Sequence, residues 1–447
     1  MGLMSVIFSA ALLIMSAVFY KRGLTHPVVC FFFVWLMVCI FSVFQNTIYH
    51  PSEQTYELII IMLLFFFVGS LATFLPQIRW SAEDLEVHHD VNKDDVAFGL
   101  LYVLLIAYIL VSLVDSLIIV RNFMEGTQLW VMRGWRMATY GVDSNPVVDR
   151  QSFIEVFIRA VVLYPFQNMI APLAAYLYFH SELRRKHRTF LVLAIVSLVL
   201  TVIATGGSRN TIVYFVACFV LYYLLSRNKS KKTQSARKPR SIWRTVGIIG
   251  VLAAGVFVIL AVTNARTTLS LEANIVSYIG ISPTLLSLHL PQIYVSRHTY
   301  GLLTFFGFVT YPFRLLQQVG LDSFVPRAYT DAFQQMLNAQ QFISVNSSEL
   351  VRNAYVTPIY YFLIDGGTPF LVFMSLLFGA VLGQFSRAFF RGFTLRSFVY
   401  YALIMQAILF SFIQVPTVQP SFVFSMLYAW ILLRPRRRFV RSSGLTA

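Results

Sequence analysis

Runs of about 20 apolar residues recur along this chain of 447 residues, and they constrain its fold more than any other feature. A helix of that length crosses the hydrocarbon core of a bilayer. Hydrophobic residues make up 57% of the chain and charged residues 12%, whereas soluble domains carry about 25% charged residues. A soluble chain of this composition could not cover itself with polar surface. The pattern therefore predicts an all-α polytopic membrane protein with a single integral membrane domain, residues 1–447.

About eleven transmembrane helices are expected from these runs, within bounds of roughly 10 to 14. The expected spans are residues 3–20, 27–45, 56–75, 97–120, 153–179, 189–206, 210–226, 245–263, 358–385, 397–415 and 418–433. No basic residue precedes the first run and no small-residue cleavage site follows it, so we expect a span and not a signal peptide.

The distribution of lysine and arginine predicts the orientation of the spans, because cytoplasmic loops are enriched in both. Alternate loops, among them the basic loop 227–244, hold every lysine and most of the 35 basic residues. We therefore expect the N-terminus outside, the C-terminus in the cytoplasm, and two longer external loops at 121–152 and 264–357. The net charge of +16 comes from separate loops and not from one basic face, which argues against a nucleic-acid partner.

The external loop 264–357 is the largest, and it is rich in aromatic residues. Its segment 300–316 is too apolar for a solvated linker, so we expect an interfacial or re-entrant helix there. Such a helix is tolerated where protein buries its backbone. Prolines predict that the loop is divided into short helices, and they are Pro283, Pro291, Pro312 and Pro326.

Every basic residue expected outside is an arginine, whose planar guanidinium can hold phosphate oxygens with two hydrogen bonds. The leading candidate for binding a diphosphate is Arg209 in the motif Thr205–Asn210. Two glycines allow a turn between spans there, and the N-terminus of the next helix favours an anion. Arg136, Arg352 and Arg314 are the other candidates. The alternatives are a plain hairpin turn for the motif, and snorkelling or ion pairing for the arginines.

Aromatic rings can stack on the apolar faces of sugars, and the candidates are Trp135, Tyr140, Tyr300 and Tyr355. Trp135 and Tyr140 lie in the loop 121–152 next to arginines, which makes it the first external loop with candidate chemistry. The alternative is an amphipathic helix whose tryptophans belong to the interfacial aromatic belt.

Asp365 lies about two turns inside the expected span 358–385, and an ionisable residue there is a functional candidate by default. Either histidine of the large loop, His289 or His298, could act as a general base near neutral pH. Asp365, Glu349 and His289 are the leading candidates for that role. The alternative for Asp365 is an ion pair with an arginine of the bundle.

Glu155 and Arg159 are four positions apart in the fifth expected span, so we expect them to form an ion pair. Asp115, near the external end of the fourth expected span, is another ionisable residue to place. The three cysteines lie inside apolar runs, and neither a zinc motif nor an Asp-x-Asp motif is present. We therefore expect metal-independent chemistry without a cofactor.

Two motifs carry a resemblance to a known family: the external Gly-Ser-Arg-Asn turn at 207–210, and the Asn-x-Tyr-x-Thr segment at 353–357 followed by Tyr360 and Asp365-Gly366-Gly367. With the span layout and the long external loop, the region 130–385 resembles the Wzy-type O-antigen and oligosaccharide repeat-unit polymerases. Residues 164–226 look most like the enterobacterial common antigen branch. The more usual Asp-Phe-Gly of the family is replaced here by Asp365-Gly366-Gly367.

The resemblance implies a GT-C-like fold in the bacterial inner membrane, with the N-terminus and the large loop in the periplasm. It implies glycosyl transfer between two undecaprenyl-diphosphate-linked glycans, one the donor and one the acceptor, in contact with membrane lipid. A polysaccharide chain-length regulator is a candidate further partner. The alternatives are an O-antigen ligase, whose His-Asn pair we do not find in the large loop, and a flippase or transporter of lipid-linked oligosaccharide.

Overall fold

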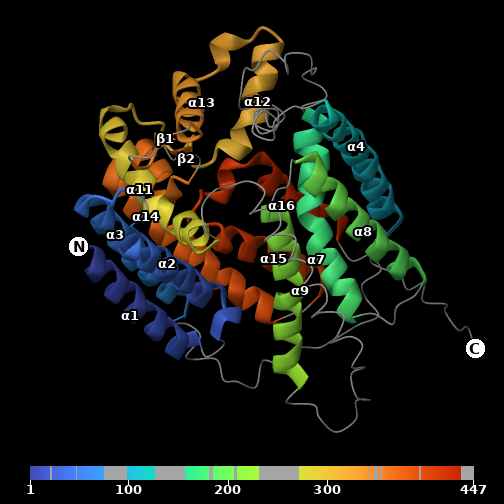
Figure 1. The fold of residues 1–447 in the computed structure, drawn as a ribbon, viewed down its shortest axis with the longest axis horizontal. Coiled ribbons are helices and arrows are strands. Elements are labelled where there is room, and N and C mark those ends of the chain that lie inside the picture. The colour runs from blue at the N-terminus through green and yellow to red at the C-terminus, as the bar shows by residue number, and fades with distance from the viewer. Residues whose placement is uncertain are drawn as a thin grey trace, which may run out of the picture.

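The computed structural model describes residues 1–20, 23–46, 48–74, 98–125, 157–180, 185–205, 209–230, 271–341, 343–346, 351–352, 355–391 and 394–433, and these residues are mostly helical (Figure 1). The first half holds α1 (Gly2–Tyr20), η1 (Gly23–Thr25), α2 (Pro27–Phe44), α3 (Glu53–Phe74), α4 (Phe98–Met124), the π-helical turn η5 (Arg159–Leu163), α7 (Tyr164–His180), α8 (Arg185–Ala204) and α9 (Arg209–Ser230). The second half holds α11 (Leu271–Val295), α12 (Phe306–Gln318), η6 (Asp322–Phe324), α13 (Arg327–Ala339), the antiparallel strands β1 (Ile343–Ser344) and β2 (Val351–Arg352), α14 (Thr357–Arg391), α15 (Leu395–Leu409), η7 (Pro416–Val418) and α16 (Pro420–Leu432).

Seven helices in the described part of the chain are long and apolar enough to cross a membrane, which supports an all-α, multi-pass membrane protein. They are α1, α2, α3, α4, η5 with α7, α8 and α14. Shorter apolar helices occur in α9, α15 and α16. Together these helices cover every expected span except 245–263, which lies outside the described residues. The count of eleven therefore remains a prediction.

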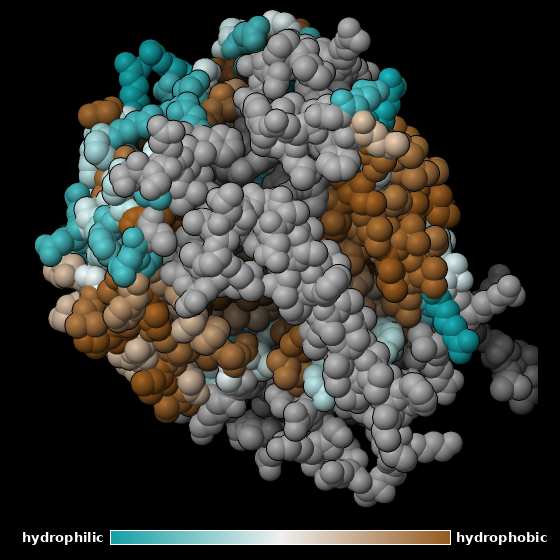
Figure 2. All heavy atoms as spheres, viewed as in Figure 1, coloured by the Kyte–Doolittle hydropathy of each residue, from teal (hydrophilic) through white to brown (hydrophobic). Residues whose placement is uncertain are grey.

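Helix α1 has a polarity opposite to that of a surface helix in a soluble protein. Its buried residues are Ser5, Ser9, Leu12, Ser16 and Tyr20, which follow one helical face. Large apolar side chains on the rest of the helix are exposed, and they include Leu3, Ile7, Ile14 and Val18. Small polar residues let membrane helices approach closely, while lipid solvates the apolar face. Helix α4 likewise carries exposed apolar side chains, which form the brown surface on the right of Figure 2.

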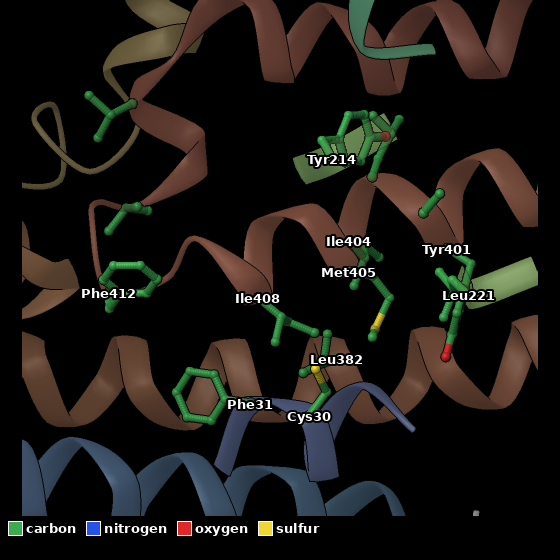
Figure 3. Close-up of a cluster of buried hydrophobic side chains, with 14 of the residues drawn as sticks. Cys30, Phe31, Tyr214, Leu221, Leu382, Tyr401, Ile404, Met405, Ile408 and Phe412 are labelled. Carbon is green, nitrogen blue, oxygen red and sulfur yellow. The ribbon is translucent and has the colours of Figure 1, made fainter. Parts of the chain in front are cut away.

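Helix α15 lies at the centre of the bundle, in contact with α2, α7, α14 and α16. Its buried residues include Tyr401, Leu403 and Ile408, so it is apolar on more than one face. Figure 3 shows side chains of α15 between this helix and Cys30 and Phe31 of α2, with Leu382 of α14 nearby. A helix surrounded in this way is a core element, which accounts for its short length compared with a lipid-facing span.

Helix α14 packs along α3 at positions where both backbones come unusually close. A Cβ atom added at Gly69 of α3 would lie 2.1 Å from the carbonyl oxygen of Leu376. A Cβ atom added at Gly379 of α14 would lie 2.1 Å from the carbonyl oxygen of Phe66. Glycine at both positions therefore permits the close packing of α3 and α14.

Residues 296–341, here called the cap, follow α11 and stand at one end of the bundle, at the top of Figure 1. The N-terminal end of α12 is buried against η7: an added Cβ at Gly307 would lie 2.6 Å from the carbonyl oxygen of Thr417. The ring of Phe306 stacks on Tyr329 of α13 at 5.7 Å. The hydroxyl of Tyr360 in α14 donates to the carbonyl of Gln335 in α13 at 2.9 Å.

The large loop differs from the sequence expectation at three prolines, while the helix expected within 300–316 is present in part as α12. Pro283 and Pro291 do not divide the loop, because both lie inside the continuous helix α11, and Pro312 lies inside α12. Packing of α11 on α2 and α14 outweighs the loss of two backbone donors. The apolar segment 300–316 is made of turns and the first part of α12, and Phe306 and Tyr311 within it are buried by the protein itself.

Replacing Gly69 or Gly379 by Ala is expected to destabilise the bundle, because overpacking costs about 1–3 kcal/mol. The melting temperature of the purified protein in detergent measures this. Gly99→Ala in α4 is the matched control, since no heavy atom lies within 4 Å of its added Cβ. Equal melting temperatures for all three variants would contradict the close packing of α3 and α14.

Candidate functional site

A break in α14 forms the centre of the candidate site. Gly366 (φ −174°, ψ 25°) and Gly367 (φ 69°, ψ −161°) are not helical, so α14 consists of a short segment, 357–365, and a longer one that follows. The backbone conformation of Gly367 is open almost only to glycine. The expected span 358–385 is therefore corrected: Asp365 lies about two turns from its start, as expected, but is the last residue before a break in the helix.

The Asp365 side chain is 1% exposed, and its carboxylate accepts three hydrogen bonds from the start of the cap. The donors are Thr299 Oγ1 at 2.5 Å and Leu303 N at 3.1 Å to Oδ1, and Thr304 N at 2.7 Å to Oδ2. The backbone adds two more contacts, from Thr299 N to Ile364 O at 3.2 Å and from Tyr300 N to Asp365 O at 3.0 Å. In the described part of the chain, the partners of this carboxylate are donors of the cap and not an arginine.

The turn that Asp365 holds presents two exposed side chains beside the break. Tyr300 is 80% exposed, and its φ of 53° is unusual for a residue with a side chain. His298 is exposed, and its Nδ1 lies 3.2 Å from the carbonyl oxygen of Ile364. Its Cε1 lies 3.8 Å from the Cβ position of Gly367. With a proton on Nδ1, this contact would leave Nε2 as a hydrogen-bond acceptor.

His289, the histidine first expected to act as a base, is in a different environment. It is 3% exposed in α11, and its ring packs edge-on against Tyr360 at 5.3 Å. Burial lowers the pKa of its imidazole below the ordinary 6.5, and a hydrogen bond with Gln292 partly offsets this. A buried neutral histidine cannot meet a substrate, so His298 replaces His289 as the candidate base.

A second cluster joins the two motifs that the resemblance rests on. The hydroxyl of Tyr278 in α11 donates to Oδ1 of Asn210, the second residue of α9, at 3.2 Å. The same ring packs edge-on against Tyr355 at 5.0 Å. Arg209 begins α9 and Arg352 lies in β2, so both backbones flank this cluster in sequence, although neither side chain belongs to the described part. Sequence reasoning missed Tyr278 as the residue that bridges the motifs.

The remaining candidates are placed as follows. Arg314 lies in the cap, with its guanidinium carbon 5.4 Å from the centre of the Phe333 ring and its charge beside Tyr329. Burial raises the pKa of Tyr329, and Arg314 partly offsets this effect. Arg136, Trp135, Tyr140 and Glu349 lie outside the described residues. Among the residues that the structure describes, no group of three or more His, Cys, Asp or Glu side chains could hold a metal ion.

Arg159 forms an ion pair with Asp115, and its expected pair with Glu155 stays a prediction. Its Nη1 lies 2.6 Å from Oδ2 of Asp115 in α4, and the two side chains are only 10% and 20% exposed. Glu155, the expected partner, lies outside the described residues. Arg159 opens the π-helical turn η5, where the carbonyl of Val161 accepts a hydrogen bond from Tyr428 at 2.6 Å. The ion pair therefore links α4 to α7 and is an unpromising phosphate site.

Comparison with known proteins identifies no relative. No protein-family model matches the chain, no curated protein matches it, and no solved structure matches it. The residues gathered at the two ends of segment 357–365 are thus the available guide to function.

The free energy of unfolding should decrease as the pH falls, because the unfolded state binds a proton at His289 more readily than the folded state does. Because its folded pKa is lowered, the neutral form contributes stability above about pH 6.5, and this contribution is lost as the pH falls toward the folded pKa. We expect the melting temperature of the wild type to drop between neutral and acidic pH by more than that of His289→Gln. His50→Gln, at an exposed position, should behave like the wild type. Identical pH profiles for wild type and His289→Gln would refute this assignment.

The pair Asp115–Arg159 should show energetic coupling. Asp115→Asn or Arg159→Gln alone leaves a poorly solvated charge, so each should lower the melting temperature. The two single effects should add up to more than the effect of the double variant, which removes both charges. A double-mutant cycle is expected to give a coupling energy of about 0.5–3 kcal/mol. Simple additivity would mean that the two charges do not interact in the folded protein.

Proposed function

We propose that the chain is a membrane-bound glycosyltransferase that polymerises undecaprenyl-diphosphate-linked oligosaccharide repeat units at the periplasmic face of the bacterial inner membrane. The observation that carries this proposal is the break in α14, where an exposed imidazole and an exposed phenol are held beside a strained backbone. Strained, over-determined backbone of this kind tends to occur at functional sites. The resemblance of the two motifs to repeat-unit polymerases points to the same reaction class.

In the proposed reaction, a hydroxyl oxygen of the acceptor repeat unit forms a bond to the anomeric carbon of the donor chain. The bond from that carbon to the diphosphate oxygen breaks, and undecaprenyl diphosphate leaves with the electron pair. The hydroxyl proton passes to Nε2 of His298, which a hydrogen bond from Nδ1 to Ile364 O would keep in the right tautomer. Tyr300 is placed to stack on a sugar of either substrate.

The diphosphate is assigned to the other end of segment 357–365. Arg209 and Arg352 flank the cluster of Asn210, Tyr278 and Tyr355 there, and the segment rises about 12 Å between its ends. Arginines placed where negative charge develops on the leaving group would lower the barrier. This separation leaves room for a sugar between the diphosphate and the base.

A transporter of lipid-linked oligosaccharide is the second candidate, because a broken helix is also typical of transporters. It differs from the polymerase in making no covalent product. An O-antigen ligase would use the same donor and transfer the glycan to a different acceptor lipid.

The test uses the full-length protein in liposomes with lipid-linked repeat units isolated from cells that lack it. We expect a ladder of extended glycans on a gel, formed equally in excess EDTA. His298→Gln should reduce the initial rate by about 10²–10⁴-fold as expected for loss of a general base, and Arg209→Ala should do so through the leaving group. His289→Gln should retain the rate.

Three results would contradict the proposal. Translocation without any new glycosidic bond indicates the transporter, and transfer only to an added lipid core indicates the ligase. A full ladder from His298→Gln removes this residue as the base, and activity that EDTA abolishes and a divalent metal restores refutes metal-independent chemistry.

A further inference from the structure

We propose that Asp365 is a positioning residue that holds the turn 298–301 at the break of α14 and takes no proton from the substrate. This inference rests on the proposed function, in which His298 is the base and Tyr300 contacts a sugar. It reassigns Asp365, which the sequence suggested as a candidate base.

The carboxylate of Asp365 is saturated with hydrogen bonds. Two oxygens accept three hydrogen bonds, and the side chain is 1% exposed. A base must reach the proton that it removes, within about 3 Å or through one water. Here the near positions are taken by Thr299 Oγ1 and by the N–H groups of Leu303 and Thr304, so an incoming hydroxyl finds the carboxylate already surrounded.

The donors to this carboxylate lie far from Asp365 in the chain. Thr299 and Thr304 bracket the turns at the start of the cap, and Thr299 is 66 positions from Asp365 in sequence. The carbonyls of Ile364 and Asp365 accept from the N–H groups of Thr299 and Tyr300. The side chain of Asp365 and the backbone carbonyls of Ile364 and Asp365 thus hold the turn 298–301 on both sides.

The backbone of the turn that these contacts hold is strained. Tyr300, with φ of 53°, precedes Gly301, with φ of 89°. A tyrosine in the left-handed region is held there only when surrounding contacts over-determine it. The contacts from Asp365 and Ile364 hold this turn, together with a hydrogen bond inside it from Leu302 N to Thr299 O at 3.0 Å. Without the carboxylate, the buried N–H groups of Leu303 and Thr304 would lose their acceptor, and the turn would relax.

The variant Asp365→Asn tests the carboxylate directly. Its side chain has nearly the same shape, but its amide N–H₂ group is a donor and cannot accept from the backbone N–H of Leu303 or Thr304. We expect faster hydrogen exchange in a peptide covering 299–305, with no change in the second half of α14. Acylation of His298 by diethyl pyrocarbonate should rise at least about threefold as the ring leaves the Ile364 carbonyl and both nitrogens become accessible. His289, which is buried, should stay unmodified and so reports that the protein is still folded.

In the polymerisation assay, Asp365→Asn should lower kcat by about 10²-fold, because a displaced reacting group costs about that much. KM should rise as well, since the released turn also carries Tyr300, which contacts a sugar in the proposed function. Asp322→Asn, at an exposed carboxylate of η6, is the matched control and should match the wild type.

A second pair of variants covers the case in which Asp365→Asn does not fold. Thr299→Val keeps the shape and removes one donor to Asp365, while Thr299→Ser restores the hydroxyl. Thr299→Val should repeat the exchange, acylation and kcat effects in weaker form, and Thr299→Ser should rescue them.

The outcomes separate this inference from the proposed function. The positioning role is overturned if Asp365→Asn shows faster exchange and acylation but a wild-type kcat. It is also overturned if exchange and acylation stay unchanged in Asp365→Asn or in Thr299→Val. If the wild type makes no polymer at all, the proposed function fails, and the exchange and acylation data alone decide whether Asp365 holds the turn.

Discussion

The carboxylate of Asp365 connects the helical bundle to the cap, and much of the geometry around the candidate site depends on it. Its three hydrogen bonds fix the turns before α12, and Thr304, one of its donors, also accepts from Thr417 of η7. One buried side chain therefore joins α14, the cap and the segment before α16. A carboxylate suits this position because it accepts several N–H and O–H donors at once, and charge strengthens each bond.

Several polar groups of the bundle find partners inside the protein, as the low polarity of a membrane interior favours. Serines of α1 face α2 rather than lipid, as where Ser9 contacts Cys39 at 3.6 Å. Arg159 and Asp115 neutralise each other between α4 and η5. Tyr428 satisfies a carbonyl in the π-helical turn η5. These contacts bind polar groups within the spans, and the exposed polar residues beside the α14 break are the better candidates for chemistry.

Segment 357–365 gives the proposed glycosyl transfer its spatial order. Its first residues lie beside Tyr355, Tyr278 and Asn210, and its last residue holds the turn with His298 and Tyr300. A short helix is rigid, so it keeps two groups of residues at a fixed separation. The break at Gly366 and Gly367 separates this short segment from the rest of α14. A continuous helix of 35 residues would be far longer than a bilayer core is thick.

The sequence by itself determined the helical membrane class and the position of each described span, because hydropathy is a sum over about 20 neighbouring residues. It also singled out Asp365, Tyr300 and Tyr355. The tertiary structure decided which histidine is exposed, which residue pairs with Arg159, and that Asp365 is fully hydrogen-bonded. Each of these depends on contacts between distant segments, such as the 66 positions between Thr299 and Asp365 or the 44 between Asp115 and Arg159. Local patterns carry no information about such pairs, whereas the folded chain fixes them through packing.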